Sequence, residues 1–208
     1  MPIALPGVTR AAAAWAIACF SAKSLLQLSQ KQAIAQAAAA RVTPGSAIGI
    51  SAGTTTYELA RAVTDVPQLT VVTNSVPVAQ LLHESGAPGQ TVVLTGGVRT
   101  PSDALVGPVA VAALRSLHVD LLFLGAHGVD ATTGLTTPNL VESETNRALV
   151  ASARHVCVLA DSSKWGTIGL STFAALSEID LFVTDQGLPE RARSAIADAV
   201  GSLEIVEA

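Results

Sequence analysis

The sequence is poor in aromatic residues, in charged residues and in cysteine. Aromatic side chains make up 3% of the 208 residues, so a stacking platform for nucleic-acid bases or sugar rings is not expected. Charged side chains make up 13% and the net charge is -4, which excludes the basic surface of a stand-alone nucleic-acid binder. The two cysteines, Cys19 and Cys157, are too few for a disulfide framework, and no metal-ligand spacing surrounds either one. We therefore expect a reduced, intracellular setting with no cofactor and no metal.

Hydrophobic residues make up 50% of the chain, which excludes a disordered protein and predicts a substantial buried core. The apolar run from Ala11 to Phe20 is too short to span a bilayer. Its length suits either the hydrophobic region of a signal peptide or an alanine-rich helix, and we favour the helix and a cytoplasmic protein. We place a boundary near residue 24, with an atypical N-terminal segment over 1–23 and one domain over 24–208.

Beyond the boundary, short β-branched runs alternate with helical stretches. The runs have the length and composition of strands buried on both faces, and they span 47–51, 69–73, 91–95, 121–125, 156–160 and 181–184. The helical stretches span 30–42, 55–63, 76–84, 108–117, 141–153 and 189–200. This alternation predicts an α/β fold with a doubly wound, mostly parallel sheet and helices on both faces.

In such a sheet, ligands bind outside the carboxyl ends of the strands, so the residues that follow each strand are the informative ones. After the first strand, Gly53 is followed by Thr54, Thr55 and Thr56 at the start of a helix. Free backbone N–H groups, the helix dipole and the hydroxyls would together bind an anion such as a phosphate. The alternative is an ordinary helix cap, because serine and threonine cap many helices.

The other strand ends are also polar or glycine-rich. The second is followed by Asn74-Ser75, the third by Gly96-Gly97 and Arg99, the fourth by Gly125 to Asp130, the fifth by Asp161 to Lys164, and the sixth ends at Thr184-Asp185. Each feature alone has an ordinary reading as a cap, a tight turn or a surface charge. Six such ends at one edge of the sheet together predict a cleft for a small polyhydroxylated anion.

These segments resemble the C-terminal sensor domain of the DeoR family of sugar-responsive transcriptional repressors. The resemblance runs from Gln30 to about Val206 and includes the Leu105-Val106-Gly107-Pro108 segment. The other matching motifs occur in the family's order: KQAIAQAAA (31–39), SAGTTTYELA (51–60), LTVVTNS (69–75), VVLTGGVR (92–99), LLFLGAHGVDATTGLTT (121–137), VLADSSKWG (158–166) and LFVTD (181–185).

The resemblance implies a fold similar to ribose-5-phosphate isomerase and its CoA-transferase-like relatives, and a phosphorylated sugar or related metabolite as effector. It also implies a homo-oligomer, with operator DNA bound only through a helix-turn-helix, for which residues 1–23 show no pattern. The sequence departs from the family at Ser51, Asn146 and His127, where an acidic residue, a lysine and an asparagine are usual. We expect the effector to contact Ser51, Gly53, Thr54, Thr55, Thr56, Asn74, Ser75, Gly96, Gly97, Arg99, Gly125, His127, Asp130, Glu142, Asp161, Ser163 and Lys164.

Two other readings stay open. The first is a sugar-phosphate isomerase of the same fold, which would need a carboxylate base and a group that polarises the carbonyl. Asp130, Glu142, Glu144 and Asp161 are candidate carboxylates and Lys164 is a candidate electrophile, but the acidic signature of true isomerases is absent. The second is a degenerate domain that only oligomerises. We expect no catalytic residue and a sensor, not an enzyme.

Overall fold

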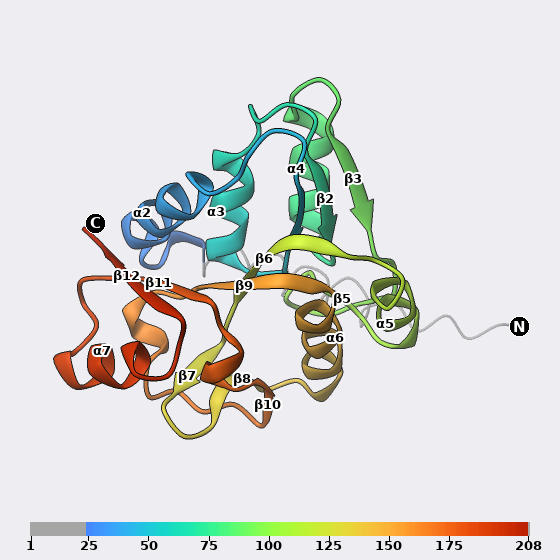
Figure 1. Cartoon of the computed structure of the whole chain (residues 1–208). Helices are drawn as coiled ribbons and strands as arrows, with labels where there is room; N and C mark the ends of the chain where they lie inside the picture. Colours follow the sequence, from blue (N-terminus) through green and yellow to red (C-terminus); the bar gives the residue numbers. More distant parts are fainter. Residues whose placement is uncertain (1–23, 208) are drawn as a thin grey trace, which may run out of the picture.

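The computed structural model describes residues 24–207, which form one central sheet of seven parallel strands (Figure 1). The strands lie in the order β12-β11-β9-β6-β1-β2-β3. Their bounds are β1 (Ala47–Ile50), β2 (Thr70–Thr73), β3 (Thr91–Leu94), β6 (Val119–Gly125), β9 (Ala153–Leu159), β11 (Leu181–Asp185) and β12 (Ser202–Val206). From β1 the chain adds strands in one direction, and from β6 it adds them in the other. The strand order therefore switches between β1 and β6.

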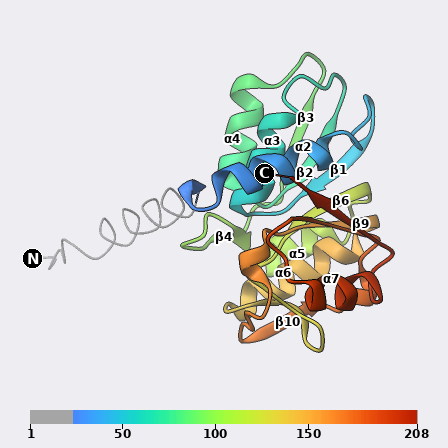
Figure 2. The ribbon, with the colours of Figure 1, turned by 90° about the vertical axis from the view of Figure 1, so that its left-hand side faces the viewer.

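Helices cover both faces of this sheet (Figure 2). One face carries α2 (Leu28–Ala39), α3 (Thr54–Ala62) and α4 (Val76–Ser85), and the other carries α5 (Pro108–Leu114), α6 (Leu140–Ala151) and α7 (Glu190–Ala197). Each helical layer packs against the sheet through its own cluster of buried hydrophobic side chains. The predicted α/β fold with helices on both faces is confirmed.

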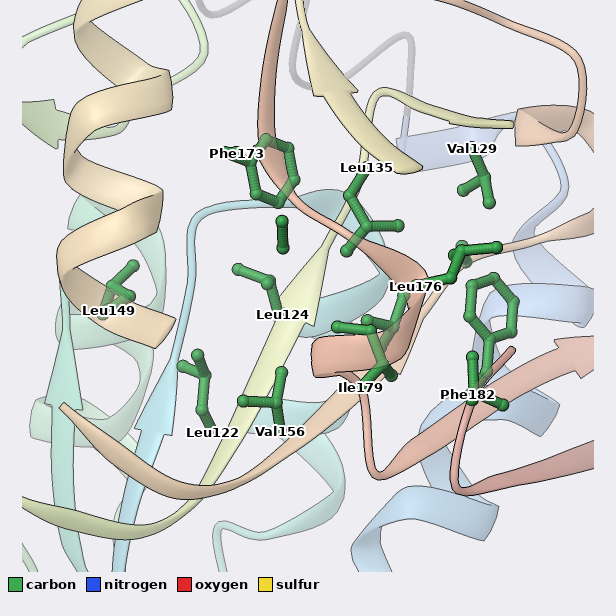
Figure 3. Close-up of a cluster of buried hydrophobic side chains, with 14 of the residues drawn as sticks. Leu122, Leu124, Val129, Leu135, Leu149, Val156, Phe173, Leu176, Ile179 and Phe182 are labelled. Atoms are coloured by element: carbon green, nitrogen blue, oxygen red, sulfur yellow. The ribbon is translucent and has the colours of Figure 1, made fainter. Parts of the chain in front are cut away.

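The two hydrophobic clusters take alternate residues of the same strands, as expected for strands buried on both sides. In β6, Leu122 and Leu124 point into the cluster beneath α5 and α6, while Phe123 points into the cluster beneath α2 and α3. Figure 3 shows Leu122 and Leu124 beside Val156 and Leu149 in the first of these clusters. All of these side chains are buried, so the middle of the sheet has no solvated face.

Smaller elements that the sequence did not predict complete the domain. A three-stranded antiparallel sheet has the order β10-β8-β7 and consists of β7 (Gly128–Asp130), β8 (Gly134–Thr137) and β10 (Ser171–Ala174). It packs Val129, Leu135 and Phe173 against the cluster of Figure 3. A two-stranded hairpin joins β4 (Val98–Arg99) to β5 (Leu105–Val106), and two 3-10 turns, η1 (Ser162–Lys164) and η2 (Leu176–Glu178), follow β9 and β10.

All six predicted strands and all six predicted helices are present, with ends that differ by a few residues. The helix predicted over 30–42 is α2 over 28–39, and the helix predicted over 108–117 ends at Leu114. The expectation for residues 1–23 lies outside the described residues. Within residues 24–207, none of the helices has both the length and the apolar character that crossing a membrane requires.

Candidate functional site

The switch between β1 and β6 brings together polar groups from three strand ends. Ser51, directly after β1, accepts a hydrogen bond at its Oγ from the backbone N–H of Gly125 at the end of β6, at 3.0 Å. Asn74, directly after β2, accepts one at Oδ1 from the N–H of Ala52, at 2.9 Å. Ser51 and Asn74 are both buried. In open α/β sheets a crevice for ligands forms at such a switch, outside the carboxyl ends of the strands.

The segment from Gly53 to Thr56 leads from this point into α3. The hydroxyl of Thr56 donates to the carbonyl of Ser51 at 2.7 Å, so it ties the start of the helix to the end of β1. The hydroxyls of Thr54 and Thr55 make no hydrogen bond with the described residues, and no side chain caps the first turn of α3. The structure therefore leaves the first N–H groups of α3 and two hydroxyls without a side-chain partner, as an anion site requires.

Asn74 also holds the β4–β5 hairpin against the strand ends. Its Nδ2 donates to the backbone carbonyl of Leu105 at 3.2 Å, and the backbone carbonyl of Asn74 accepts from the N–H of Leu105 at 2.7 Å. The neighbouring Ser75 caps α4, since its Oγ accepts from the N–H of Val78. Asn74 thus has a structural role between β1 and the hairpin, and Ser75 acts as the predicted cap.

Gly96 and Gly97 lead into this hairpin, and Arg99 is the last residue of its first strand, β4. Gly97 has φ +119°, and a Cβ there would lie 2.5 Å from the carbonyl oxygen of Val106, so the close pairing of the hairpin explains this glycine. Arg99 forms an ion pair with Asp103, in which Nη2 lies 2.6 Å from Oδ1. Its side chain remains 53% exposed, so the outer part of the guanidinium can still meet an anion.

Glu142, in the first turn of α6, accepts hydrogen bonds from three hydroxyls. Thr100 donates to Oε1 at 3.0 Å, Ser102 donates to the same oxygen, and Thr137 donates to Oε2 at 3.1 Å. The carboxylate therefore joins the β4–β5 loop and the end of β8 to the N-terminus of α6. A carboxylate with three hydroxyl donors has little capacity left for an effector, although Glu142 lies beside the hairpin.

The turn after β9 contains an incompletely bonded carboxylate. Oδ1 of Asp161 accepts from the N–H of Ser163 at 3.1 Å and from the Ser163 hydroxyl, while Oδ2 is buried without a hydrogen-bond partner in residues 24–207. Lys164 Nζ lies 4.0 Å from Oδ2. The Asp161 side chain is 1% exposed, and burying an acceptor that has no hydrogen bond is costly, so this oxygen is suited to a donor from outside the chain.

The remaining predicted residues follow β6. Asp130 accepts at Oδ1 from the N–H groups of Thr132 and Thr133 in the turn between β7 and β8, each at 2.9 Å. These backbone hydrogen bonds lower the pKa of the Asp130 carboxyl below its usual value. His127 lies exposed in the loop between β6 and β7. The geometry gives Asp130 a role in the hairpin turn, and its contact with an effector stays a prediction.

Sequence reasoning missed several polar residues of this edge. They are Thr100, Ser102 and Thr137, which surround Glu142. The sequence identified Asp185 only as the end of a strand with a simple turn, whereas in the structure its carboxylate binds the turn after β9. Two surface hollows lie elsewhere, one between α2 and α3 beside Glu58 and one between α6 and β10 beside Arg147.

Comparisons with known proteins identify the family to which this chain belongs. The family model described as the DeoR C terminal sensor domain matches residues 26–186. The HTH-type transcriptional regulator GlpR of Haloferax volcanii is 40% identical over 181 residues, which cover 86% of this chain and 70% of that protein. The putative aga operon transcriptional repressor of Escherichia coli O157:H7 is 34% identical over 168 residues, covering 80% of this chain and 62% of the repressor. The chain thus spans about two thirds of the length of these relatives.

Solved structures show a similar fold at low identity. The eIF2B beta structure from Chaetomium thermophilum has a TM-score of 0.50 at 13% identity and covers 85% of this chain and 54% of that chain. The ribose 5-phosphate isomerase A structure from Methanocaldococcus jannaschii has a TM-score of 0.48 at 20% identity and covers 67% of this chain and 55% of that chain. These likenesses concern the fold alone. By the family match and its relatives, the chain belongs to the DeoR family, with its C-terminal sensor domain over residues 26–186.

Proposed function

We propose that this chain is the effector-sensing part of a transcriptional regulator of sugar metabolism, and that it binds a phosphorylated sugar at the carboxyl ends of its strands. The carrying observation is the Gly53–Thr56 segment at the switch between β1 and β6. This segment combines unoccupied hydroxyls with the start of a helix, at the place where α/β sheets bind their ligands. The phosphate would lie there.

The turn after β9 supports a sugar as the rest of the ligand. Asp161 Oδ2 is a buried acceptor without a hydrogen-bond partner in the described part of the chain, and a sugar hydroxyl is a donor of suitable size. Lys164 is close enough to Asp161 to be oriented by it and can donate to a second oxygen of the ligand. β9 is separated from β1 only by β6, so one sugar phosphate can reach the carboxyl ends of both β1 and β9.

The relatives described above are named as an HTH-type transcriptional regulator and a transcriptional repressor, and from them we infer that this chain takes part in the regulation of transcription. In this proposal the effector changes how a longer regulator, or a separate helix-turn-helix chain, holds operator DNA. The protein acts in the cytoplasm, as a homo-oligomer, and catalyses no reaction. Lys164 contacts the effector without forming a covalent bond, because its Nζ pairs with the Asp161 carboxylate at 4.0 Å from Oδ2.

Calorimetric titration with a panel of pentose and hexose phosphates, and with the same sugars lacking phosphate, tests the proposal. At least one phosphorylated sugar should bind, and its unphosphorylated form should bind far more weakly. Changing Thr54 and Thr55 together to alanine should weaken binding by about tenfold or more, since a charge-assisted hydrogen bond contributes about 1.5–3 kcal/mol. Equal affinity of the double variant and the wild type would show that the phosphate does not bind at α3. The absence of binding across the whole panel would overturn the proposal.

A matched pair of cation variants tests the second half of the site. Lys164→Met should weaken binding of the same sugar phosphate, whereas Arg154→Met, at the opposite end of β9, should not. Incubation of the wild-type chain with the sugar phosphate and borohydride should give no adduct on Lys164. A trapped adduct, or proton exchange between ribose 5-phosphate and solvent, would favour the isomerase reading instead.

A further inference from the structure

Exposed aliphatic side chains gather beside the strand ends. Among residues 24–207, ten large hydrophobic side chains are exposed, and seven of them belong to three segments, 94–109, 138–142 and 166–170. We name these seven side chains the carboxyl-edge band; they are Leu94, Val98, Val109, Leu140, Val141, Ile168 and Leu170. Val98 is 70% exposed and Leu170 73%. A monomeric surface rarely shows so many large apolar side chains in one place without a function.

The three segments are neighbours in space. A Cβ built on Gly96 would lie 3.5 Å from Val109 Cγ1, and one on Gly107 would lie 3.8 Å from Val141 Cγ1. Gly169, between Ile168 and Leu170, lies against the backbone of Thr137 and Pro138, just before Leu140. The band therefore runs from the end of β3, past the β4–β5 hairpin and the start of α5, to the start of α6 and the loop before β10.

The charge of these segments excludes several kinds of partner. They contain only Arg99, Asp103 and Glu142 as charged residues. Arg99 and Asp103 pair with each other, and Glu142 is bonded to three hydroxyls. Nucleic acids and anionic lipid surfaces need clustered lysine or arginine, which these segments lack. A nearly neutral apolar surface is complementary to another surface of the same kind.

The sheet edge next to the band is also unprotected. β3 pairs with β2 on one side, and no other described strand pairs with its second side. Its residues, Thr91–Leu94, include no charge and no proline. Natural proteins usually protect an open edge with lysine, proline or a covering element, so an edge without them is suited to a protein contact. At the opposite edge, by contrast, β12 carries Glu204, which pairs with Arg41.

We propose that the carboxyl-edge band is the surface through which two copies of this chain associate. The three segments contain 26 residues, of which 19 are not buried, and a stable interface uses about 20–30 residues from each partner. A two-fold contact brings the same patch of both copies together, so the patch has to be complementary to itself. A neutral, apolar patch without unpaired charge fulfils this condition. Association buries the aliphatic side chains and places the second copy beside Gly96 and Arg99 of the proposed effector site.

Sedimentation velocity of the full chain without effector tests this surface independently of sugar binding. The wild-type chain should be a dimer or a larger assembly of dimers. Val98→Glu with Leu170→Glu should raise the dissociation constant of association by at least tenfold, because each glutamate would be buried against apolar groups. The matched control is Leu25→Glu with Leu26→Glu, which introduces the same charges at exposed leucines outside the band and should leave the dissociation constant unchanged.

Circular dichroism and thermal melting of each variant show whether it is folded. Should the double glutamate variant fail to fold, Val98→Ser with Leu170→Ser provides the same comparison with a milder change. A monomeric wild-type chain at 100 μM, an unchanged dissociation constant in the folded band variants, or an equal loss in the control would each overturn the proposal. Co-sedimentation of the chain with phosphatidylglycerol vesicles, abolished by the band variants alone, would assign the surface to a membrane and overturn it as well.

Discussion

The carboxylate of Asp185, at the end of β11, holds the backbone and the side chain of Ser162 in the turn after β9. Oδ2 accepts from the Ser162 N–H at 2.7 Å, and Oδ1 accepts from the Ser162 hydroxyl at 2.9 Å. Oδ1 also accepts from the N–H of Gly187 at 2.8 Å. Asp185 is buried, so these bonds are shielded from water. The position of Asp161 and Lys164 on either side of Ser162 and Ser163 therefore depends on a residue of the next strand.

Replacing Asp185 with asparagine should weaken sugar-phosphate binding by about tenfold, the effect of losing roughly one charge-assisted hydrogen bond. In either orientation the amide nitrogen would face a backbone N–H, that of Ser162 or that of Gly187, so two donors would meet and the turn would shift. Asp180→Asn is the matched control, because Asp180 accepts from the N–H of Val156 at 2.7 Å near the other end of β9. Calorimetry should show a loss of affinity for D185N alone, and equal affinities in both variants would contradict this role.

Asn74→Ala should destabilise the domain by about 1–3 kcal/mol, because it removes the acceptor of Ala52 N–H and leaves the buried Leu105 carbonyl without one of its donors. Urea denaturation followed by circular dichroism measures the loss. Asn74→Asp keeps the acceptor for Ala52 but places a second oxygen against the Leu105 carbonyl, so it should also be destabilising. A neutral effect of both changes would show that the hairpin does not depend on Asn74.

Asp130 should contribute to stability in a pH-dependent way. Its pKa is lowered in the folded chain by the backbone N–H groups of Thr133 and Thr132, so its contribution is present above the ordinary carboxyl pKa of 3.8. The contribution is lost as the pH falls through the lowered value. Asp130→Asn keeps an acceptor oxygen in the turn but cannot titrate, so its unfolding free energy should fall less steeply below pH 4 than that of the wild type. Parallel acid slopes in the two proteins would assign the acid sensitivity to other carboxyls.

Cys157 should resist thiol reagents while the domain is folded. Burial raises the pKa of its thiol to about 12, so almost no thiolate exists at pH 8 and no solvent path reaches the sulfur. Ellman's reagent added to a Cys19→Ser variant should react only after denaturant is added, with one thiol released per chain. Rapid reaction of the native variant would show that the layer beneath α2 and α3 opens readily.

The sheet could be predicted because its first six strands are short apolar runs, most of them buried on both sides and only β3 at an open edge. β12 differs, since Ser202–Val206 has only exposed and half-buried positions at the sheet edge and includes Glu204, so its composition resembles a loop. The antiparallel sheet was missed for another reason. β7 and β8 contain glycines and threonines whose burial depends on the cluster around Leu135, and that cluster forms only when distant segments meet.

That the candidate residues lie at one edge of the sheet could be predicted, but their contacts with one another could not. Ser51, Asn74 and Asp161 follow buried strands in the sequence, and the structure places all three at the carboxyl edge. Their hydrogen-bond partners could not be predicted, because Ala52 meets Asn74 and Ser162 meets Asp185 across neighbouring strands that are more than 20 residues apart in the chain. The ion pair between Arg99 and Asp103 could not be predicted either, because it depends on the conformation of the turn between them, in which Asp103 has φ +60°.

The burial of β6 on both sides has a mechanical consequence. A shift of β6 by one residue would move Phe123 to the layer that contains Leu122 and would move Leu122 to the opposite layer, so neither closely packed cluster would accept its new side chain. The strand is therefore fixed in register, and Gly125 at its end cannot be displaced along the strand axis by a ligand. A response to an effector has to travel through the segments that border the strand ends, such as the β4–β5 hairpin and the turn after β9, while the sheet serves as a stationary frame.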